Sequence, residues 1–152
     1  MNLGKKRWSV VGARILLAVV FFVYGALKLT GNQFGLGEGL THSRLSDTSP
    51  LIVTWYFFNL SPLYRDSIAF AQIGTGLLLL FRRTAPIGAL CFLVIIVNIV
   101  LINFGYNIAN DVKILSSVLL AIDCFLIVNY LPRYRMLLDT DDAKPIDRST
   151  QA

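Results

Sequence analysis

Residues 24–35 read Tyr-Gly-Ala-Leu-Lys-Leu-Thr-Gly-Asn-Gln-Phe-Gly, and at this stretch a long apolar run gives way to a polar, glycine-rich segment. The residues upstream, from position 10 to position 23, are almost all Val, Leu, Ile, Ala or Phe. Extended to position 29, the run has about 20 residues, which at about 1.5 Å per residue crosses a hydrocarbon core of about 30 Å. The stretch therefore predicts the end of a first membrane span over residues 10–29.

The composition of the whole chain agrees with a membrane location. Of its 152 residues, 55% are hydrophobic and 15% are charged, whereas a soluble domain carries about 25% charged residues. The net charge of +5 comes from basic residues at the ends of apolar runs and not from a basic patch on a polar domain. We therefore expect one integral membrane domain whose partner is the lipid bilayer, and no binding of nucleic acid.

The basic start of the chain resembles a secretory signal peptide, because Lys5, Lys6 and Arg7 precede an apolar run. The run is longer than the apolar region of a signal peptide, contains Arg14, and lacks a small-x-small cleavage site. We therefore expect the first span to be retained.

Three further apolar segments have the length of a span, so the sequence predicts an all-α fold with spans at about 10–29, 62–81, 85–104 and 111–131. Ser61-Pro62 and Thr84 with Pro86 are helix-start signals, and Pro132 is expected to end the last helix. The turns at 82–84 and 105–110 are short, which makes neighbouring helices antiparallel. The predicted architecture is an antiparallel four-helix bundle.

The remaining segments are expected to lie outside the bilayer. Residues 1–9 form a basic tail, residues 132–152 a polar tail, and residues 31–61 a loop. Within this loop, the aromatic segment 51–60 is too short to span, so it is expected at the membrane interface or across the mouth of the bundle.

The distribution of basic residues predicts the orientation, because cytoplasmic loops are rich in Lys and Arg. One side would collect Lys5, Lys6, Arg7, Arg82, Arg83, Arg133 and Arg135, and the other Arg44, Arg65 and Lys113. Both termini are therefore expected in the cytoplasm (N-in/C-in), in a multi-pass protein of the cell membrane, the inner membrane in a bacterium.

Several polar residues lie inside the predicted spans, where an unpartnered polar group is costly. The candidate ligand-binding residues are Tyr24, Lys28, Gln72, Asn98, Ser116, Ser117 and Asp123. They would face inward, either as a polar pocket in the outer half of the bundle that could bind a quinone head group, or as ordinary hydrogen-bonding glue between helices. The sequence leaves both alternatives open.

Two charged candidates have alternatives of their own. Lys28 shares a helix face with Arg14 and Gly25, and it either extends to the interface as an anchor or lines the pocket. Asp123 either pairs with Arg14 or is a neutral carboxyl hydrogen-bonded to Gln72, and we prefer the second alternative.

The chain offers no residues for redox or metal chemistry of its own. His42 is its one histidine, and Cys91 and Cys124 lie in apolar segments and are expected to be small core residues. A bis-histidine haem, a thiolate metal site and a nucleophile–base pair are therefore not expected. The sequence predicts no cofactor held by this chain alone, although a quinone could bind between helices, and no enzyme activity of the chain by itself.

Several short motifs resemble the DoxX-like family of small four-span membrane proteins. They are Tyr24-Gly25-x-x-Lys28, Trp55-Tyr56, Arg83-Thr84-x-x-x-Gly88-Ala89 and Asn103-Phe104-x-Tyr106, with Arg14 upstream, and the resemblance covers residues 10–131. Many members have Asp after that last Tyr, where this chain has Asn107. The resemblance implies association with quinone-linked redox complexes, since the family takes its name from a subunit of a quinone-linked oxidoreductase.

Three functions follow as hypotheses. The first is an accessory subunit of a quinone-linked membrane redox complex, without a redox centre of its own. The alternatives are a protein that binds or transports a small molecule, and a structural partner of a larger complex or homo-oligomer.

Overall fold

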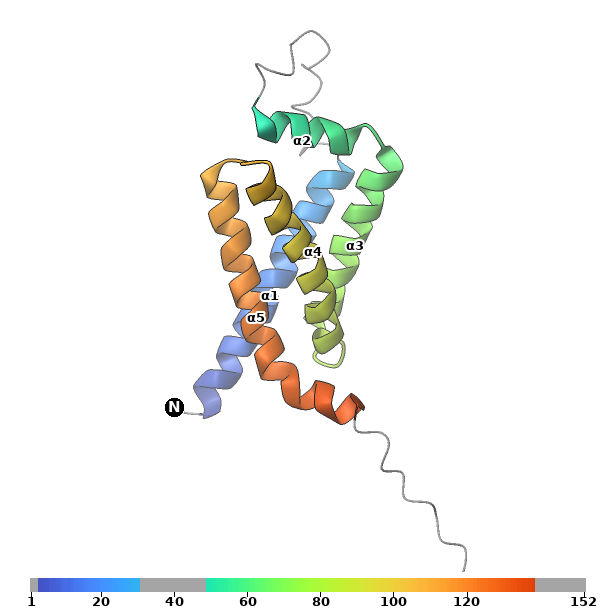
Figure 1. Cartoon of the computed structure of the whole chain (residues 1–152). Coiled ribbons are helices and arrows are strands. Elements are labelled where there is room, and N and C mark those ends of the chain that lie inside the picture. Colours follow the sequence, from blue (N-terminus) through green and yellow to red (C-terminus); the bar gives the residue numbers. More distant parts are fainter. Residues whose placement is uncertain (1–2, 31–48, 139–152) are drawn as a thin grey trace, which may run out of the picture.

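The computed structural model describes residues 3–30 and 49–138, and over these ranges it consists of five helices and contains no strand. The helices are α1 (Leu3–Leu29), α2 (Pro50–Asn59), α3 (Pro62–Leu80), α4 (Ala85–Gly105) and α5 (Asn110–Leu138). Figure 1 shows α1, α3, α4 and α5 packed together, with α2 lying across one end. We call this end the α2 end, and the opposite end, where residues 81–84 join α3 to α4, the turn end. The all-helical prediction is confirmed.

Three of the helices are long and apolar enough to cross a membrane. They are α1 over Arg7–Leu29, α4 over Ala85–Gly105 and α5 over Asn110–Met136. The shorter α3 carries Arg65 and Asp66 near its start and is not among these three helices. The described helices therefore support a membrane protein.

The helix starts read from the sequence agree with the structure. Ser61 caps α3, where its hydroxyl accepts a hydrogen bond from the backbone N–H of Tyr64 at 3.4 Å, and Pro62 follows as the first helical residue. Thr84 precedes α4, but its hydroxyl donates instead to the carbonyl of Leu78 at 2.8 Å. That hydrogen bond ties the start of α4 back to the end of α3.

The prediction that Pro132 ends the last helix is wrong, because Pro132 lies inside α5, which continues to Leu138. Contacts with the rest of the bundle hold the additional turns at the turn end, where Figure 1 shows α5 bending. The hydroxyl of Tyr134 donates to the carbonyl of Pro86 at 2.7 Å, and Arg133 donates to the carbonyl of Arg82 at 3.2 Å. Similarly, α1 begins at Leu3, so residues predicted as a tail are already helical.

The buried core lies mainly toward the turn end. The rings of Phe21 on α1 and Phe92 on α4 stack with their centroids 3.8 Å apart. Around them lie Leu17, Ala18, Leu79, Ala85, Ala89, Ile96, Leu126 and Tyr130, all buried. Cys91 is half-buried and Cys124 is exposed, so the expectation that Cys124 is a core residue is wrong.

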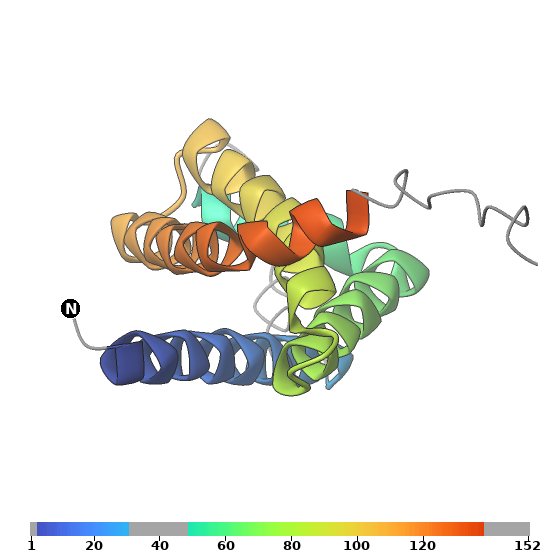
Figure 2. The same cartoon turned by 90° about the horizontal axis from the view of Figure 1, so that it is seen from below.

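The helices α3 and α4 are in close contact at the turn end and diverge toward the α2 end (Figure 1). Gly88 permits the contact, because a Cβ at this position would lie 2.9 Å from the backbone nitrogen of Leu79. Figure 2, seen from the turn end, shows α4 starting beside α3 and ending beside α5. The two helices therefore enclose a wedge of space that widens toward α2.

Candidate functional site

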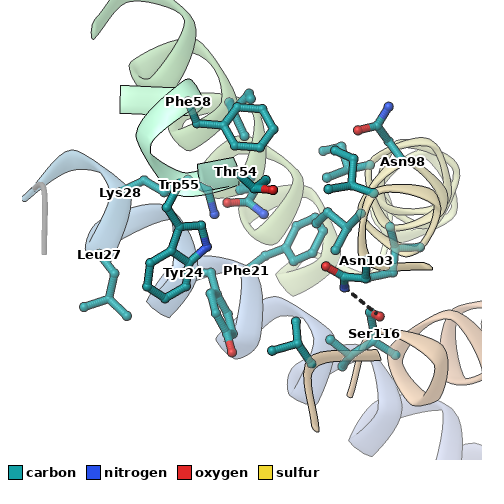
Figure 3. A pocket seen from close by; sticks show the side chains of 18 of the residues that line it. Phe21, Tyr24, Leu27, Lys28, Thr54, Trp55, Phe58, Asn98, Asn103 and Ser116 are labelled. Atoms are coloured by element: carbon teal, nitrogen blue, oxygen red, sulfur yellow. Dashed lines mark hydrogen bonds between the residues drawn. The ribbon is translucent and has the colours of Figure 1, made fainter. Parts of the chain in front are cut away.

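A cavity of about 760 Å³ occupies this wedge, and all five helices contribute to its walls. Its deeper walls are apolar, with Val20 and Phe21 from α1, Ile96 from α4 and Leu119 from α5. Figure 3 shows the aromatic and polar side chains that converge around it. A volume of this size suits a small organic molecule, since ligand pockets typically measure about 300–1,000 Å³.

Helix α2 closes the cavity at its wide end, where Thr54, Trp55 and Phe58 line it. The ring of Phe58 stacks on that of Tyr64 at the start of α3, with centroids 5.8 Å apart. Arg65 donates to the side-chain oxygen of Asn59 at 3.1 Å, which fastens the end of α2 to α3. An aromatic roof thus covers the space between the diverging helices.

Lys28 lies in the last turn of α1 and faces the cavity (Figure 3), with only 9% of its surface exposed. Its ammonium nitrogen is 5.7 Å from the centroid of the Tyr24 ring, which is within the range of a cation–π contact. Lys28 therefore does not fit the alternative of an exposed anchor that extends to the membrane interface.

The amide side chains of the cavity differ in their partners. Asn103 is buried and donates to the hydroxyl of Ser116 at 3.0 Å, and this hydroxyl donates in turn to the carbonyl of Lys113 at 3.1 Å (Figure 3). Gln72 is also buried, but its side-chain oxygen has no hydrogen-bond partner among the described residues. The Asn103–Ser116 bond joins α4 to α5 as interhelical glue, whereas Gln72 retains unused hydrogen-bonding capacity.

Five of the predicted site residues line this one cavity: Tyr24, Lys28, Gln72, Asn98 and Ser116. Ser117 is half-buried on α5 and is not part of the lining, and Asp123 lies one turn beyond Leu119, outside the cavity. Counted at about 1.5 Å per residue along the predicted spans, the depth of Gln72 is similar to that of Asp123, in a layer further in than the other candidates. The structure instead groups Gln72 with the outer candidates, because the wedge extends inward to its level.

Both predicted partners of Asp123 are wrong for this structure. The carboxyl group is fully buried, and neither oxygen has a hydrogen-bond partner in the described part of the chain. Gln72 does not bond to it, and no ion pair with Arg14 forms, since the one ion pair within residues 3–30 and 49–138 joins Arg65 and Asp66 at 2.9 Å. The Nε of Arg14 is likewise buried without a partner.

Sequence reasoning missed Arg65 and Asn103 as parts of the cavity, and it expected the aromatic segment 51–60 at the interface or across the mouth of the bundle without naming its residues as lining. Arg65 was expected at the surface, and Asn103 was noticed only as part of a motif. A signal existed for Asn103, because an amide near the end of an apolar span needs a partner on another helix. The described residues contain no group of three His, Cys, Asp or Glu side chains that could hold a metal ion.

Comparison with curated proteins finds a relative of similar length: YwoB from Bacillus subtilis (strain 168), an uncharacterized protein, is 39% identical over 134 residues, covering 88% of this chain and 82% of the relative. The chain belongs to the YwoB family. The aligned length exceeds that of any single helix, so what this chain shares with YwoB extends across the bundle. No protein-family profile and no solved structure matches the chain. The resemblance to the DoxX-like family therefore stays a prediction.

Proposed function

We propose that the chain is a four-span protein of the bacterial inner membrane, N-in/C-in, that binds a small amphipathic molecule in the cavity beneath α2. The observation that carries this proposal is the cavity itself, with mostly apolar deep walls, the amide of Gln72 at mid-depth, and further polar side chains toward the α2 end. A largely preformed apolar pocket with a few convergent polar groups is the usual form of a small-molecule site.

The fourth span in this proposal is α3. It has 19 residues, which at about 1.5 Å per residue gives about 28 Å, close to the thickness of the hydrocarbon core. It packs against both α1 and α4, so a bilayer that contains those two helices would also contain α3. Arg65 and Asp66 lie in its first turns and pair with each other near the α2 end.

The orientation follows from the arginines at the turn end. Arg82 and Arg83 form the turn between α3 and α4, and Arg133 bonds to Arg82 from α5. Because basic loops remain in the cytoplasm, the turn end would face the cytoplasm and the cavity would lie in the outer half of the bilayer.

Cysteine labelling tests this topology. In a variant without Cys91 and Cys124, a single cysteine is introduced either in the α3–α4 turn (Arg83→Cys) or in the α4–α5 turn (Ala109→Cys), both at exposed positions. A membrane-impermeant thiol reagent added to intact cells should label Ala109→Cys and leave Arg83→Cys unlabelled until the cells are opened. Labelling of Arg83→Cys from outside would contradict the topology.

A quinone is one ligand that the lining fits, and this favours the accessory role in a quinone-linked complex that the DoxX resemblance implies. Trp55 and Phe58 offer faces on which a planar ring can stack. Lys28 and the amide nitrogen of Gln72 can donate hydrogen bonds to quinone carbonyl oxygens. In this role the chain would hold the quinone for a redox partner that supplies the electrons.

Ligand binding can be tested by filling the cavity. Ile99 lines the cavity from α4, whereas the nearby Val97 lies outside the lining and is 37% exposed. With the purified protein in detergent, a short-chain menaquinone analogue should raise the melting temperature of the wild type and of Val97→Trp, but not that of Ile99→Trp. Equal stabilisation of all three proteins would place the binding outside the cavity. If neither this analogue nor any amphiphile tested stabilises the wild type, the proposed function fails.

A further inference from the structure

Among the described residues, the charged side chains that line the cavity are all basic. Lys28 and Arg65 belong to the lining, and no Asp or Glu of residues 3–30 or 49–138 does. Arg65 is already paired with Asp66 at 2.9 Å and bonded to Asn59. Lys28 has no acidic side chain within 4.0 Å in the described part of the chain. The cavity wall therefore carries an excess positive charge, and this charge is centred on Lys28.

The groups around Lys28 compensate this charge only in part. The ring of Tyr24, 5.7 Å away, offers the negative face of a quadrupole, and the end of α1 offers the fractional negative charge of a helix C-terminus. Neither is a full counter-charge, and Lys28 is 9% exposed. A buried ammonium group is costly unless it is paired, so the site favours an anion.

The N-terminus of α3 also favours an anion at this end of the cavity. The start of α3 supplies Tyr64 and Arg65 to the cavity lining. The N-terminus of a helix is the positive end of its dipole and favours negatively charged groups nearby, although the N–H groups of Tyr64 and Arg65 are themselves bonded to Ser61. The end of the cavity beneath α2 is therefore positive through the Lys28 side chain and the start of α3, while its deeper walls are mostly apolar.

The cavity also opens to the side. Ala71 on α3, and Val94 and Asn98 on α4, line the cavity and are exposed. These residues lie on the two helices that diverge toward α2, so one exposed part of the lining lies between α3 and α4 (Figure 1). In a bilayer, an opening at this place would face lipid, so a molecule with an alkyl chain could enter sideways and leave its chain between the helices.

We propose that the cavity binds an amphiphile with an anionic head group, a carboxylate or a phosphate, which pairs with Lys28 beneath α2 while its alkyl chain lies against the apolar walls. This inference rests on the proposed function, since it names the class of ligand that the same cavity would take. The anionic head group distinguishes this ligand from a neutral quinone, which offers only carbonyl acceptors to the ammonium group of Lys28.

The test compares ligands with the same chain and different head groups. Binding of dodecyl phosphate, dodecanoate and dodecanol to the purified protein is measured in nanodiscs of a zwitterionic lipid. Because charge-assisted hydrogen bonds are roughly twice as strong as neutral ones, both anions should bind about tenfold more tightly than dodecanol. Inorganic phosphate at millimolar concentration should not displace them, and effective displacement would overturn the role of the alkyl chain.

Variants show whether Lys28 causes the preference. Lys28→Gln should bind the anions about as weakly as dodecanol, and Lys28→Arg should retain part of the preference. Lys113 is the matched control, because its ammonium lies 5.8 Å from the Phe104 ring but outside the cavity lining. Lys113→Gln should therefore bind like the wild type, and an equal loss in both Gln variants would overturn the role of Lys28.

The possible results separate this inference from the proposed function. If a quinone analogue or dodecanol binds the wild type as tightly as the anions do, the anion inference is wrong and the proposed function stands. If no amphiphile binds the wild type, both are wrong. The ligand series on the wild type decides between these results even if Lys28→Gln does not fold.

Discussion

The two ends of the bundle differ in how closely α3 and α4 pack against each other. At the turn end, Gly88 lets α3 and α4 come into close contact, and the stacked rings of Phe21 and Phe92 fill the centre. At the α2 end the same two helices diverge, and the space between them is lined by polar and aromatic side chains beneath a short helix. The comparison indicates that close packing at one end of α4 is what leaves a cavity at the other.

The polar groups of the two ends also differ. Near the α2 end, Asn103 and Ser116 bond to each other, and Arg65 bonds to Asp66 and Asn59. Toward the turn end, Asp123 and the Nε of Arg14 are buried without a partner in the described residues. Around the cavity, bonded groups such as Asn103 and Ser116 thus lie beside the unbonded oxygen of Gln72, whereas the packed half contains a buried carboxyl group without a partner in the described residues.

The largest expected effect is the loss of the central ring. Phe92→Ala should lower the free energy of unfolding in detergent by about 3 kcal/mol, because it removes a fully buried ring and leaves a void. Phe58→Ala, in the half-buried roof of the cavity, should cost about 1 kcal/mol or less. Denaturant titration of both variants measures the difference. Equal losses would mean that the roof is as tightly packed as the core, which would contradict the comparison.

A smaller effect is expected where α3 and α4 make contact. Gly88→Ala should destabilise the protein by about 2 kcal/mol, because the new Cβ would lie 2.9 Å from backbone that cannot move aside locally. Gly74→Ala is the matched control, since no atom lies within 4 Å of its Cβ position. This control should be neutral, or more stable by up to about 1 kcal/mol, because Ala favours a helix over Gly. Melting curves that rank the two variants in the opposite order would contradict the close contact.

The smallest expected change in stability is for substitutions of the acidic residues Asp123 and Asp66. Asp123→Leu should raise the free energy of unfolding by about 1 kcal/mol, because it replaces a buried carboxyl without partners by an apolar side chain. The paired, more exposed Asp66 provides the contrast, and Asp66→Asn should lower stability by at most about 1 kcal/mol. Thermal melts of the two variants in the same detergent provide the comparison. A marked loss of stability in Asp123→Leu would show that this carboxyl group has a partner.

The sequence by itself determined the helices. Apolar runs of span length fix where long helices form, and the Ser61-Pro62 start of α3 was readable because capping depends only on neighbouring residues. Five of the seven candidate residues line one cavity, and for Tyr24, Asn98 and Ser116 a constant rise per residue already predicts a similar depth in the outer half of the spans. Helix length, capping and depth along a helix depend on neighbouring residues or on a constant rise, so they can be predicted from the sequence.

The tertiary structure decided what is not local. Pro132 remains inside α5 because Arg133 bonds to Arg82 in the turn between α3 and α4 and Tyr134 bonds to Pro86 in the first turn of α4, and both contacts join residues about 50 positions apart in the chain. Whether Lys28 is an anchor or a cavity residue depends on the divergence of α3 from α4, and the roof depends on how α2 folds across both. A helical pattern specifies which face of a helix is buried, but the angle between two helices follows from the side chains that meet at their contact, here at Gly88.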